Sequence, residues 1–471
     1  MTPSFLDRES TVAPPGFDRF LVPPAALAVH LSIGQAYAFS TFNLPLTKLI
    51  GLKASAPEDW KLATVGWTFS IAIAILGLSA AVFGRWVERV GPRKSMFTAA
   101  LCFSGGFMVA ALGIHLHELW LLYLGYGVLG GCGLGIGYIS PVSTLIKWFP
   151  DRPGMATGMA IMGFGGGALI AAPLSLLLME HFKTATSNGV LETFVTMGVI
   201  YFMFMMIGVY AVRVPAPDWK PEGWAPAAQP RPLVTSANVA VELAWRTPQF
   251  WLLWVVLCMN VTAGIGVLGQ ASPMIQEIFN GKVSPAAAAG FVGLISLFNM
   301  GGRFFWASTS DYIGRRNTYM VFFLLGILLY STVPTLGHLG SVPLFVAAFC
   351  VILSMYGGGF ATIPAYLKDV FGTLHVGAIH GRLLTAWAVA GVLGPVLVNY
   401  IRQYQIDNGV PKAQAYSVTM YIMCGLLLIG FLCNFAMRAV DDKYHYRTPS
   451  PGETPGGKTR TGNAPRGSVK A

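Results

Sequence analysis

Charged side chains are scarce in this sequence. Of its 471 residues only 11% are Asp, Glu, Lys or Arg, whereas 54% are hydrophobic. Soluble domains carry about 25% charged residues, so the composition alone excludes an ordinary soluble protein. Apolar runs of the length that a membrane helix needs, roughly 20 residues, recur along almost the whole chain. We count twelve such runs, and we therefore expect an all-α membrane protein with twelve transmembrane helices.

Groups of residues that carry out chemistry are missing as well. All six cysteines fall inside apolar runs, where a free thiol behaves as a small hydrophobic residue, so disulfides and metal clusters are not expected. The glycine-rich stretch GFGGGA at 163–168 follows no strand and lies within an apolar run, which excludes a dinucleotide-binding loop. No nucleophile–base set is evident. The sequence therefore predicts no enzyme, no cofactor and no metal site.

The net charge of +11 reflects membrane topology. Basic residues gather in alternate loops, for example 85–94, 213–246 and 315–316, whereas the intervening loops hold few. Cytoplasmic loops carry such an excess of Lys and Arg. We therefore expect a multi-pass protein of the inner (plasma) membrane with both termini in the cytoplasm. We expect the protein to be monomeric. We expect no nucleic-acid partner.

Composition divides the chain into five parts. A polar cytoplasmic segment (1–18) precedes six apolar runs (19–213), and a proline-rich cytoplasmic loop (214–247) separates these from six more (248–438). The polar tail (439–471) has almost nothing to bury, and we expect it to be disordered.

The two sets of six runs repeat one another. GRWVERVGPRK follows the second run and ASTSDYIGRR follows the eighth, and in each an acid precedes a glycine by three positions. Glu88 and Asp311 lie 223 positions apart. The same offset relates Gly91 to Gly314, Pro141 to Pro364, and the pair Gly154/Gly158 to Gly377/Gly381. One offset at several landmarks indicates duplication of a six-helix half, which is the architecture of the major facilitator superfamily.

The loop at 84–94 also resembles the glycine–acid–glycine–basic signature of that superfamily, with Glu88 where Asp is commoner. Four further segments resemble the oxalate/formate antiporter family and its monocarboxylate-carrying relatives: GIGYISP with KWFPDRPGMATG, RTPQFWLLW, FNMGGRFFW and DVFGT. The resemblance covers about residues 20–438. It implies a substrate site at mid-membrane between the two halves, reached by alternating access.

Arg303 is the most unusual residue of the apolar runs. It lies in the eighth run, eight positions before Asp311, and an arginine near the bilayer centre costs on the order of 2.5–3.5 kcal/mol. It could snorkel to the surface or pair with a buried acid, but no Asp or Glu lies in the middle of any run. A transported carboxylate, gripped through two parallel hydrogen bonds, is the favoured partner. The resemblance implies the same role.

Several polar and aromatic residues are candidates for the walls of this site. Asn299 lies one helical turn before Arg303 and could orient the guanidinium, touch substrate or bind a neighbouring helix. The resemblance places Tyr37, Tyr138 and Tyr356 at cavity positions, although ordinary packing is an alternative for each. His30 is a candidate proton site because imidazole titrates near neutrality, with a simple hydrogen-bonding role as the alternative.

Trp387 is the sharpest guide to the substrate. The dicarboxylate-exchanging member of the family carries a second cation, a lysine, at the position that aligns with Trp387. No Lys or Arg occurs from Leu383 to Tyr400. A dianion held by one arginine would leave a carboxylate unpaired in a medium of low dielectric constant, which is costly. We therefore expect a preference for monocarboxylates over oxalate.

By analogy with the superfamily, Glu88, Arg93, Asp311 and Arg315 are expected to form a gate at the inner ends of the helices, with loop solubility and topology as the alternative. The sequence thus predicts a secondary transporter for small carboxylates such as formate or lactate. An oxalate/formate-type exchanger is the first alternative. An efflux pump for amphiphiles, or a transporter-like sensor, is the second.

Overall fold

The computed structural model describes residues 4–224, 233–235, 237–268, 270–279 and 282–445. These residues form helices and turns, with no β-sheet among them. Eleven of their helical segments are long and apolar enough to cross a membrane, and α12, with 29 residues, is a further helix of that length. The expected all-α fold with twelve spans is confirmed. Residues 225–232 of the central loop and 446–471 of the tail lie outside the described residues.

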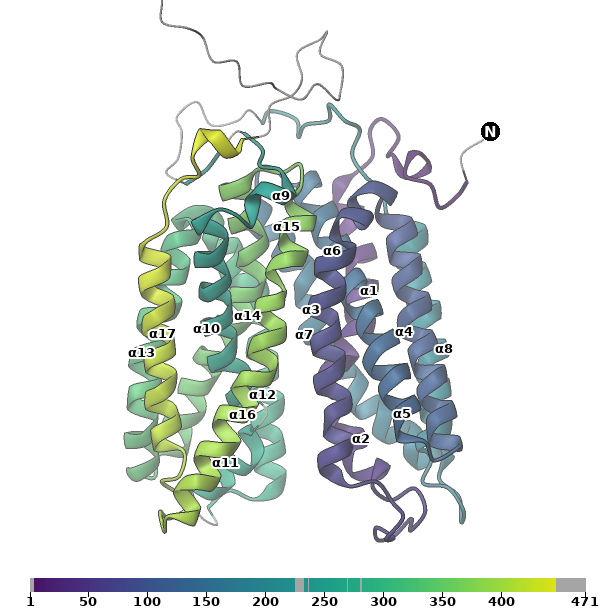
Figure 1. Ribbon diagram of the computed structural model, residues 1–471, viewed down its shortest axis with the longest axis vertical. Coiled ribbons are helices and arrows are strands. Elements are labelled where there is room, and N and C mark those ends of the chain that lie inside the picture. The colour runs from purple at the N-terminus through teal and green to yellow at the C-terminus, as the bar shows by residue number, and fades with distance from the viewer. Residues whose placement is uncertain (1–3, 225–232, 236, 269, 280–281, 446–471) are drawn as a thin grey trace, which may run out of the picture.

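The first six spans lie in one group (Figure 1). The first span continues from α1 into a 3-10 segment. The fourth span contains a π-helical segment, in which each backbone hydrogen bond spans five residues instead of the four of an α-helix. The elements are α1 (Val22–Ile33), η3 (Gly34–Ala38), α2 (Ser40–Leu46), α3 (Leu62–Val90), α4 (Pro92–His115), α5 (Leu119–Leu122), η4 (Tyr123–Gly130), α6 (Gly131–Trp148), α7 (Pro153–Phe182) and α8 (Val190–Ala211).

The last six spans form a second group beside the first (Figure 1). The eleventh is divided into α15 and α16, which meet at Leu384. The elements are α9 (Val241–Ala244), α10 (Pro248–Leu268), α11 (Ala271–Ile278), α12 (Pro285–Ile313), α13 (Arg315–His338), α14 (Val342–Phe371), α15 (Val376–Leu383), α16 (Thr385–Asp407) and α17 (Ser417–Phe435). The groups meet where α7 packs on α12 and α14, and where α3 packs on α15 and α16.

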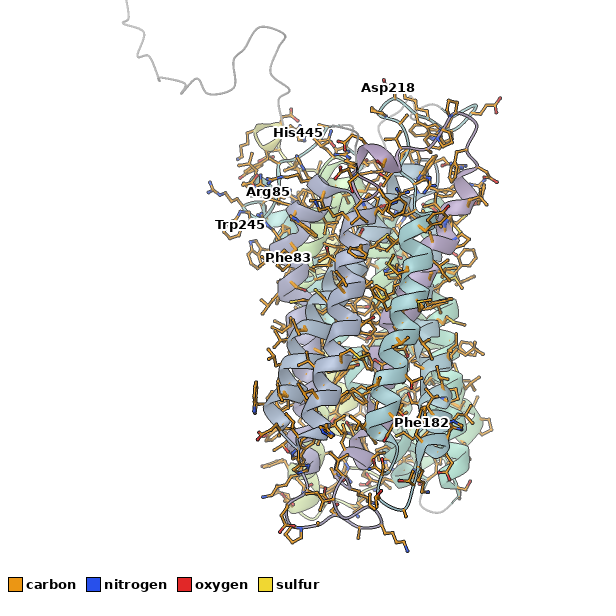
Figure 2. The ribbon with its side chains drawn as sticks, turned by 90° about the vertical axis from the view of Figure 1, so that its right-hand side faces the viewer. Phe83, Arg85, Phe182, Asp218, Trp245 and His445 are labelled. Carbon is orange, nitrogen blue, oxygen red and sulfur yellow. The ribbon has the colours of Figure 1, made fainter. Side chains whose placement is uncertain are left out.

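The two ends of the bundle differ. One end, here called the loop end, carries the N-terminal segment, the central loop and residues 439–445 (Figure 1). Figure 2 shows Arg85, Asp218, Trp245 and His445 near the loop end and Phe182 towards the opposite, far end.

The duplicated glycines shape both halves in the same way. Gly91 ends α3 with φ at 84°, and Gly314 ends α12 with φ at 85°. Positive φ is accessible to glycine at little steric cost. Each glycine is also the residue that precedes the next helix, so one residue joins α3 to α4 and one joins α12 to α13.

The first residues of the expected tail, up to His445, lie within the described part of the chain. Asp442–Tyr444 form a 3-10 turn, and His445 makes an isolated β-bridge with Val239 of the central loop. Val12 of the N-terminal segment makes a similar bridge with Val214. Segments that look purely polar in the sequence are therefore tied to one another at the loop end.

At the far end a single carboxylate organises the connection between α2 and α3. The Asp59 carboxylate accepts hydrogen bonds from the backbone N–H groups of Ile50 (2.8 Å), Gly51 (3.0 Å) and Ala56 (2.8 Å). Burial by itself raises the pKa of Asp59, but these hydrogen bonds outweigh it and hold the pKa below the ordinary value of 3.8. The charged form of Asp59 therefore stabilises the loop.

Asp59→Asn should loosen this loop, because the amide provides only one oxygen acceptor and no charge. Hydrogen bonds to a charged group contribute about 1.5–3 kcal/mol each, so we expect at least a tenfold faster cleavage of the 49–60 loop in limited proteolysis at pH 7. In the wild type the stabilisation is complete above pH 3.8 and is lost as the pH falls through the lower folded-state pKa. Glu58→Gln, at the exposed neighbouring position, should cleave like the wild type; equal cleavage of the Asp59 variant would refute the role.

Candidate functional site

Arg303 of α12 lies at the interface of the two groups of helices and is 0% exposed. Its Nε donates to Asn299 Oδ1 at 3.2 Å and its Nη1 donates to the carbonyl oxygen of Ile161 at 3.4 Å. Its Nη2 has no hydrogen-bond partner. Both acceptors are neutral oxygens, and none of the ion pairs among the described residues includes Arg303. A buried charge in this condition lacks a counter-ion.

Two phenylalanine rings flank the guanidinium. Arg303 Cζ lies 5.8 Å from the ring centroid of Phe164 in α7 and 5.4 Å from that of Phe360 in α14. Cation–π contacts of this length stabilise the charge without neutralising it. Neither ring was predicted from the sequence. Phe360 follows Tyr356 by one helical turn, which could have indicated its place, whereas Phe164 is hidden in a glycine-rich stretch.

The predicted aromatic residues gather around Arg303 from both halves. Tyr37 of η3 and Tyr356 of α14 place their hydroxyl oxygens 3.3 Å apart. The Trp387 ring of α16 lies 5.4 Å from that of Tyr138 in α6 and 6.4 Å from that of Tyr37. All three tyrosine hydroxyls interact electrostatically with Arg303.

Three hydrogen-bond donors in this cluster are unsatisfied. Arg303 Nη2, the Tyr138 hydroxyl and Trp387 Nε1 are all buried without a hydrogen bond of ordinary length and angle, and the Tyr37 and Tyr138 hydroxyls are only loosely associated with the Arg303 guanidinium. Buried polar groups are normally paired, because an unpaired donor keeps the full cost of losing water. One cationic donor and two neutral donors beside it suit a small anion that brings its own acceptor oxygens.

His30 packs against the same cluster from α1. Its Nδ1 lies 2.5 Å from the Ala160 carbonyl oxygen and its Nε2 lies 3.2 Å from that of Tyr138. A neutral imidazole has one N–H and can donate to only one of these carbonyls, whereas the protonated ring can donate to both. The two carbonyl oxygens can therefore accept hydrogen bonds from a protonated His30 imidazole, but the positive charge of that ring would be buried.

A second buried histidine was missed in the sequence. His380 of α15 is 1% exposed, its Nε2 has no partner, and its ring lies 5.9 Å from that of Tyr138. His380 is buried because α15 packs against α3 of the first half, a contact that no sequence pattern indicates.

Two acids cap helices across the interface. Asp311 of α12 accepts hydrogen bonds from the backbone N–H groups of Gly154 (2.9 Å) and Met155 (2.8 Å) at the start of α7. Glu88 of α3 accepts one from Ala378 N (3.0 Å) at the start of α15. A carboxylate is favourable at a helix N-terminus, where unpaired N–H groups point outward.

Small residues make this contact possible. A Cβ atom on Gly154 would lie 2.1 Å from the Ala307 carbonyl oxygen, and one on Gly381 would lie 2.2 Å from the Ala80 carbonyl oxygen. Backbones of the two halves therefore touch at positions that the duplication repeats.

The two predicted basic gate residues have different environments. Arg315 forms an ion pair with Asp311 and another with Asp369 at 3.3 Å. Arg93 contacts no gate residue: it donates to the Phe5 and Val209 carbonyl oxygens and lies 4.3 Å from the Phe5 ring centroid. In this conformation Arg93 anchors the N-terminal segment to the first half, and its place in a gate stays a prediction.

Comparison with known proteins fits this architecture. The Major Facilitator Superfamily profile matches residues 16–395. The oxalate:formate antiporter of Oxalobacter formigenes is 27% identical, over 79% of this chain and 81% of that protein. Monocarboxylate transporter 1 of Mus musculus is 23% identical, over 94% of this chain and 92% of that protein. A solved structure of a proton:xylose symporter has a TM-score of 0.67 at 14% identity, covering 90% of this chain and 95% of that one, a likeness of fold alone.

The missing counter-ion of Arg303 leads to a prediction about stability. Arg303→Met removes a buried unpaired charge and keeps an apolar side chain of similar length, so the substrate-free protein should melt at the same temperature or up to about 4 °C higher. The control is Arg402→Met, since Arg402 Nε donates to Glu277 Oε2 at 2.8 Å; loss of this pair should lower the melting temperature. A clear decrease for Arg303→Met in detergent thermal-unfolding assays would instead identify Arg303 as a structural residue.

Proposed function

Because the chain belongs to the major facilitator superfamily, we propose that it is a secondary carrier of small carboxylate anions that works by alternating access. The chain is a transporter related to the oxalate:formate antiporter and to monocarboxylate transporters, not an enzyme. One observation carries the choice of substrate: the buried Arg303 guanidinium has no carboxylate partner among the described residues, and its Nη2 makes no hydrogen bond of ordinary geometry. The transported anion supplies the missing charge.

The surroundings of Arg303 support a monoanion. Phe164, Phe360 and Trp387 are apolar surfaces next to one cation, and the unpaired donors of Tyr138 and Trp387 are neutral. One carboxylate can take the guanidinium and these donors, while a methyl or hydroxymethyl group contacts the rings. A second carboxylate would enter the same apolar surroundings without a cation. Formate, lactate and related short 2-hydroxy or 2-oxo acids fit this chemistry.

His30 is the proposed proton site of this carrier. Its two ring nitrogens both face carbonyl oxygens, and Arg303 interacts with it electrostatically. A bound carboxylate would offset the Arg303 charge and thereby make protonation of the imidazole less costly. Proton and anion would then bind together.

The loop end is the proposed cytoplasmic side, in keeping with the basic residues of its loops. Asp311 and Glu88, each capping a helix of the other half, close this end in the conformation described. Separation of the halves must break both caps, so the acids favour the state in which the loop end is shut.

Transport into liposomes tests the proposed function. Wild-type protein should take up labelled lactate or formate, and Arg303→Lys should reduce uptake at least tenfold, because lysine keeps the charge but loses the two-pronged hydrogen bonding. Arg246→Lys, at an exposed site before α10, is the matched control and should transport normally. Wild-type uptake by Arg303→Lys and Arg303→Ala would refute an anion site at this residue.

Competition measures the substrate preference. Unlabelled lactate should displace labelled lactate at least tenfold more effectively than oxalate does, because only one carboxylate can pair with Arg303. Trp387→Lys places a second cation beside the cluster, so oxalate should compete better and the tenfold advantage of lactate over oxalate should decrease. If oxalate competes as well as lactate in the wild type, the protein is an oxalate/formate-type exchanger instead.

The gate is tested by removing both acidic caps. In a protein without the six native cysteines, Glu88→Gln with Asp311→Asn should shift the population towards the state that is open at the loop end. Labelling of Thr41→Cys, at the far end, should then slow at least threefold. A labelling rate equal to that of the protein with both acids intact would support a purely topological role for these residues.

A further inference from the structure

A cavity lies at the loop end, and the capping residue Glu88 is part of its lining. Its volume is about 630 Å³, within the range of sites for small molecules. Both halves contribute to its walls: Arg85, Glu88 and Arg89 of α3 and Lys147 of α6 on one side, and Thr373 to His375 on the other. Figure 2 shows Arg85 at this end of the molecule. We infer that the cavity binds a multivalent anion bearing phosphate or carboxylate groups, and that the bound anion holds the loop end shut.

The lining has more positive charge than its own acids can neutralise. Arg8, Arg85, Arg89 and Lys147 line it, with Glu88 as the acidic residue among the lining side chains. Arg85 pairs with Glu242 at 2.6 Å. Glu88 is engaged by the Ala378 N–H and by His375 Nδ1 at 3.4 Å.

Three cations make no direct ion pair among the described residues: Arg8, Arg89 and Lys147. Glu88 attracts Lys147 from a greater distance, and this one carboxylate cannot neutralise all three. They come from the N-terminal segment, α3 and α6, and the cavity brings them together. Such a concave cluster of one sign concentrates oppositely charged ligands.

Membrane topology alone does not explain the position of Lys147. The positive-inside bias is satisfied by a charge anywhere on the cytoplasmic surface, as at the exposed Arg246. Lys147 is instead mostly buried, next to Phe149 and Trp148, which are fully buried. A lysine that is largely withdrawn from water at the wall of a cavity gains most from an anion in that cavity.

The number of cations indicates the class of ligand. A monocarboxylate can neutralise one of them, whereas a di- or triphosphate or a polycarboxylate can contact several at once. Multiple charge-assisted hydrogen bonds to one ligand add both affinity and selectivity. Phosphate and carboxylate groups would be bound by the same cations, so pyrophosphate and citrate serve as separate probes of the two ligand types.

Binding here depends on the conformation of the transporter. The ligand would touch α3 and α6 of one half and residues 373–375 of the other, and these walls separate when the loop end opens. A ligand that binds one conformation better shifts the population towards it. The anion would therefore act as an inhibitor of the transport cycle from the loop end.

Thermal unfolding of the purified full-length protein tests binding. Pyrophosphate or citrate should raise the melting temperature in a saturable way, beyond the effect of NaCl at equal ionic strength. Arg89→Gln and Lys147→Gln should each weaken the apparent affinity about tenfold, and Arg246→Gln should leave it unchanged. Arg303→Met should also leave it unchanged, which separates this cavity from the proposed transport site; the two proposals can then fail independently.

The same ligand should accelerate labelling of Thr41→Cys at the far end, because it favours closure of the loop end. A temperature shift no larger than that in NaCl, or one that persists unchanged in both Arg89→Gln and Lys147→Gln, would overturn the site. Saturable binding with an unchanged labelling rate would overturn the locking role.

Discussion

A buried guanidinium without a counter-ion is the constraint on which the centre of this protein depends. Arg303 is held by Asn299 and by one backbone carbonyl, and its remaining nitrogen is unsatisfied. Such a charge is tolerated inside a low-dielectric bundle only where the structure around it is arranged for a partner that arrives and leaves. The rings of Phe164 and Phe360 reduce the cost while leaving the hydrogen-bonding positions free. The site is therefore stable enough to persist, and the guanidinium can still bind an anion.

The interface between the halves is the second feature on which the centre of the protein depends. The halves pack on each other through α7 with α12 and α14 and through α3 with α15 and α16. Carboxylates on helix N-termini and close approaches at glycine belong to this interface. A carboxylate on the N-terminus of a helix is favourable in the closed arrangement and needs no change within either half when it is released. The Arg303 cluster lies on this boundary.

Much of this arrangement could be predicted from the sequence. Apolar runs give the helices, and the shared offset of 223 gives the duplication, which Gly91 and Gly314 then show as equal backbone angles. Arg303 was recognisable because its charge contradicts its surroundings. Its aromatic neighbours were expected from a resemblance, and the structure brings Tyr37, Tyr138, Tyr356 and Trp387 together around it.

Other features depend on contacts that a linear pattern does not encode. The sequence shows Arg93 next to an acidic signature, but its partners are carbonyl oxygens of Phe5 and Val209, which any residue type could provide. His380 is buried because α15 packs against α3 of the other half. The loop-end cavity likewise combines residues from distant segments.

The reciprocal capping by Glu88 and Asp311 has a consequence for the origin of the molecule. Each half donates one acid and presents one helix start, so the same contact is made twice in opposite directions. Contacts of this kind are the ones that two identical subunits form across a twofold axis. A single ancestral half could therefore have worked as a symmetric dimer before its gene was doubled and fused. After fusion the two copies were free to differ, and in this chain the second half carries Arg303 whereas the first carries His30.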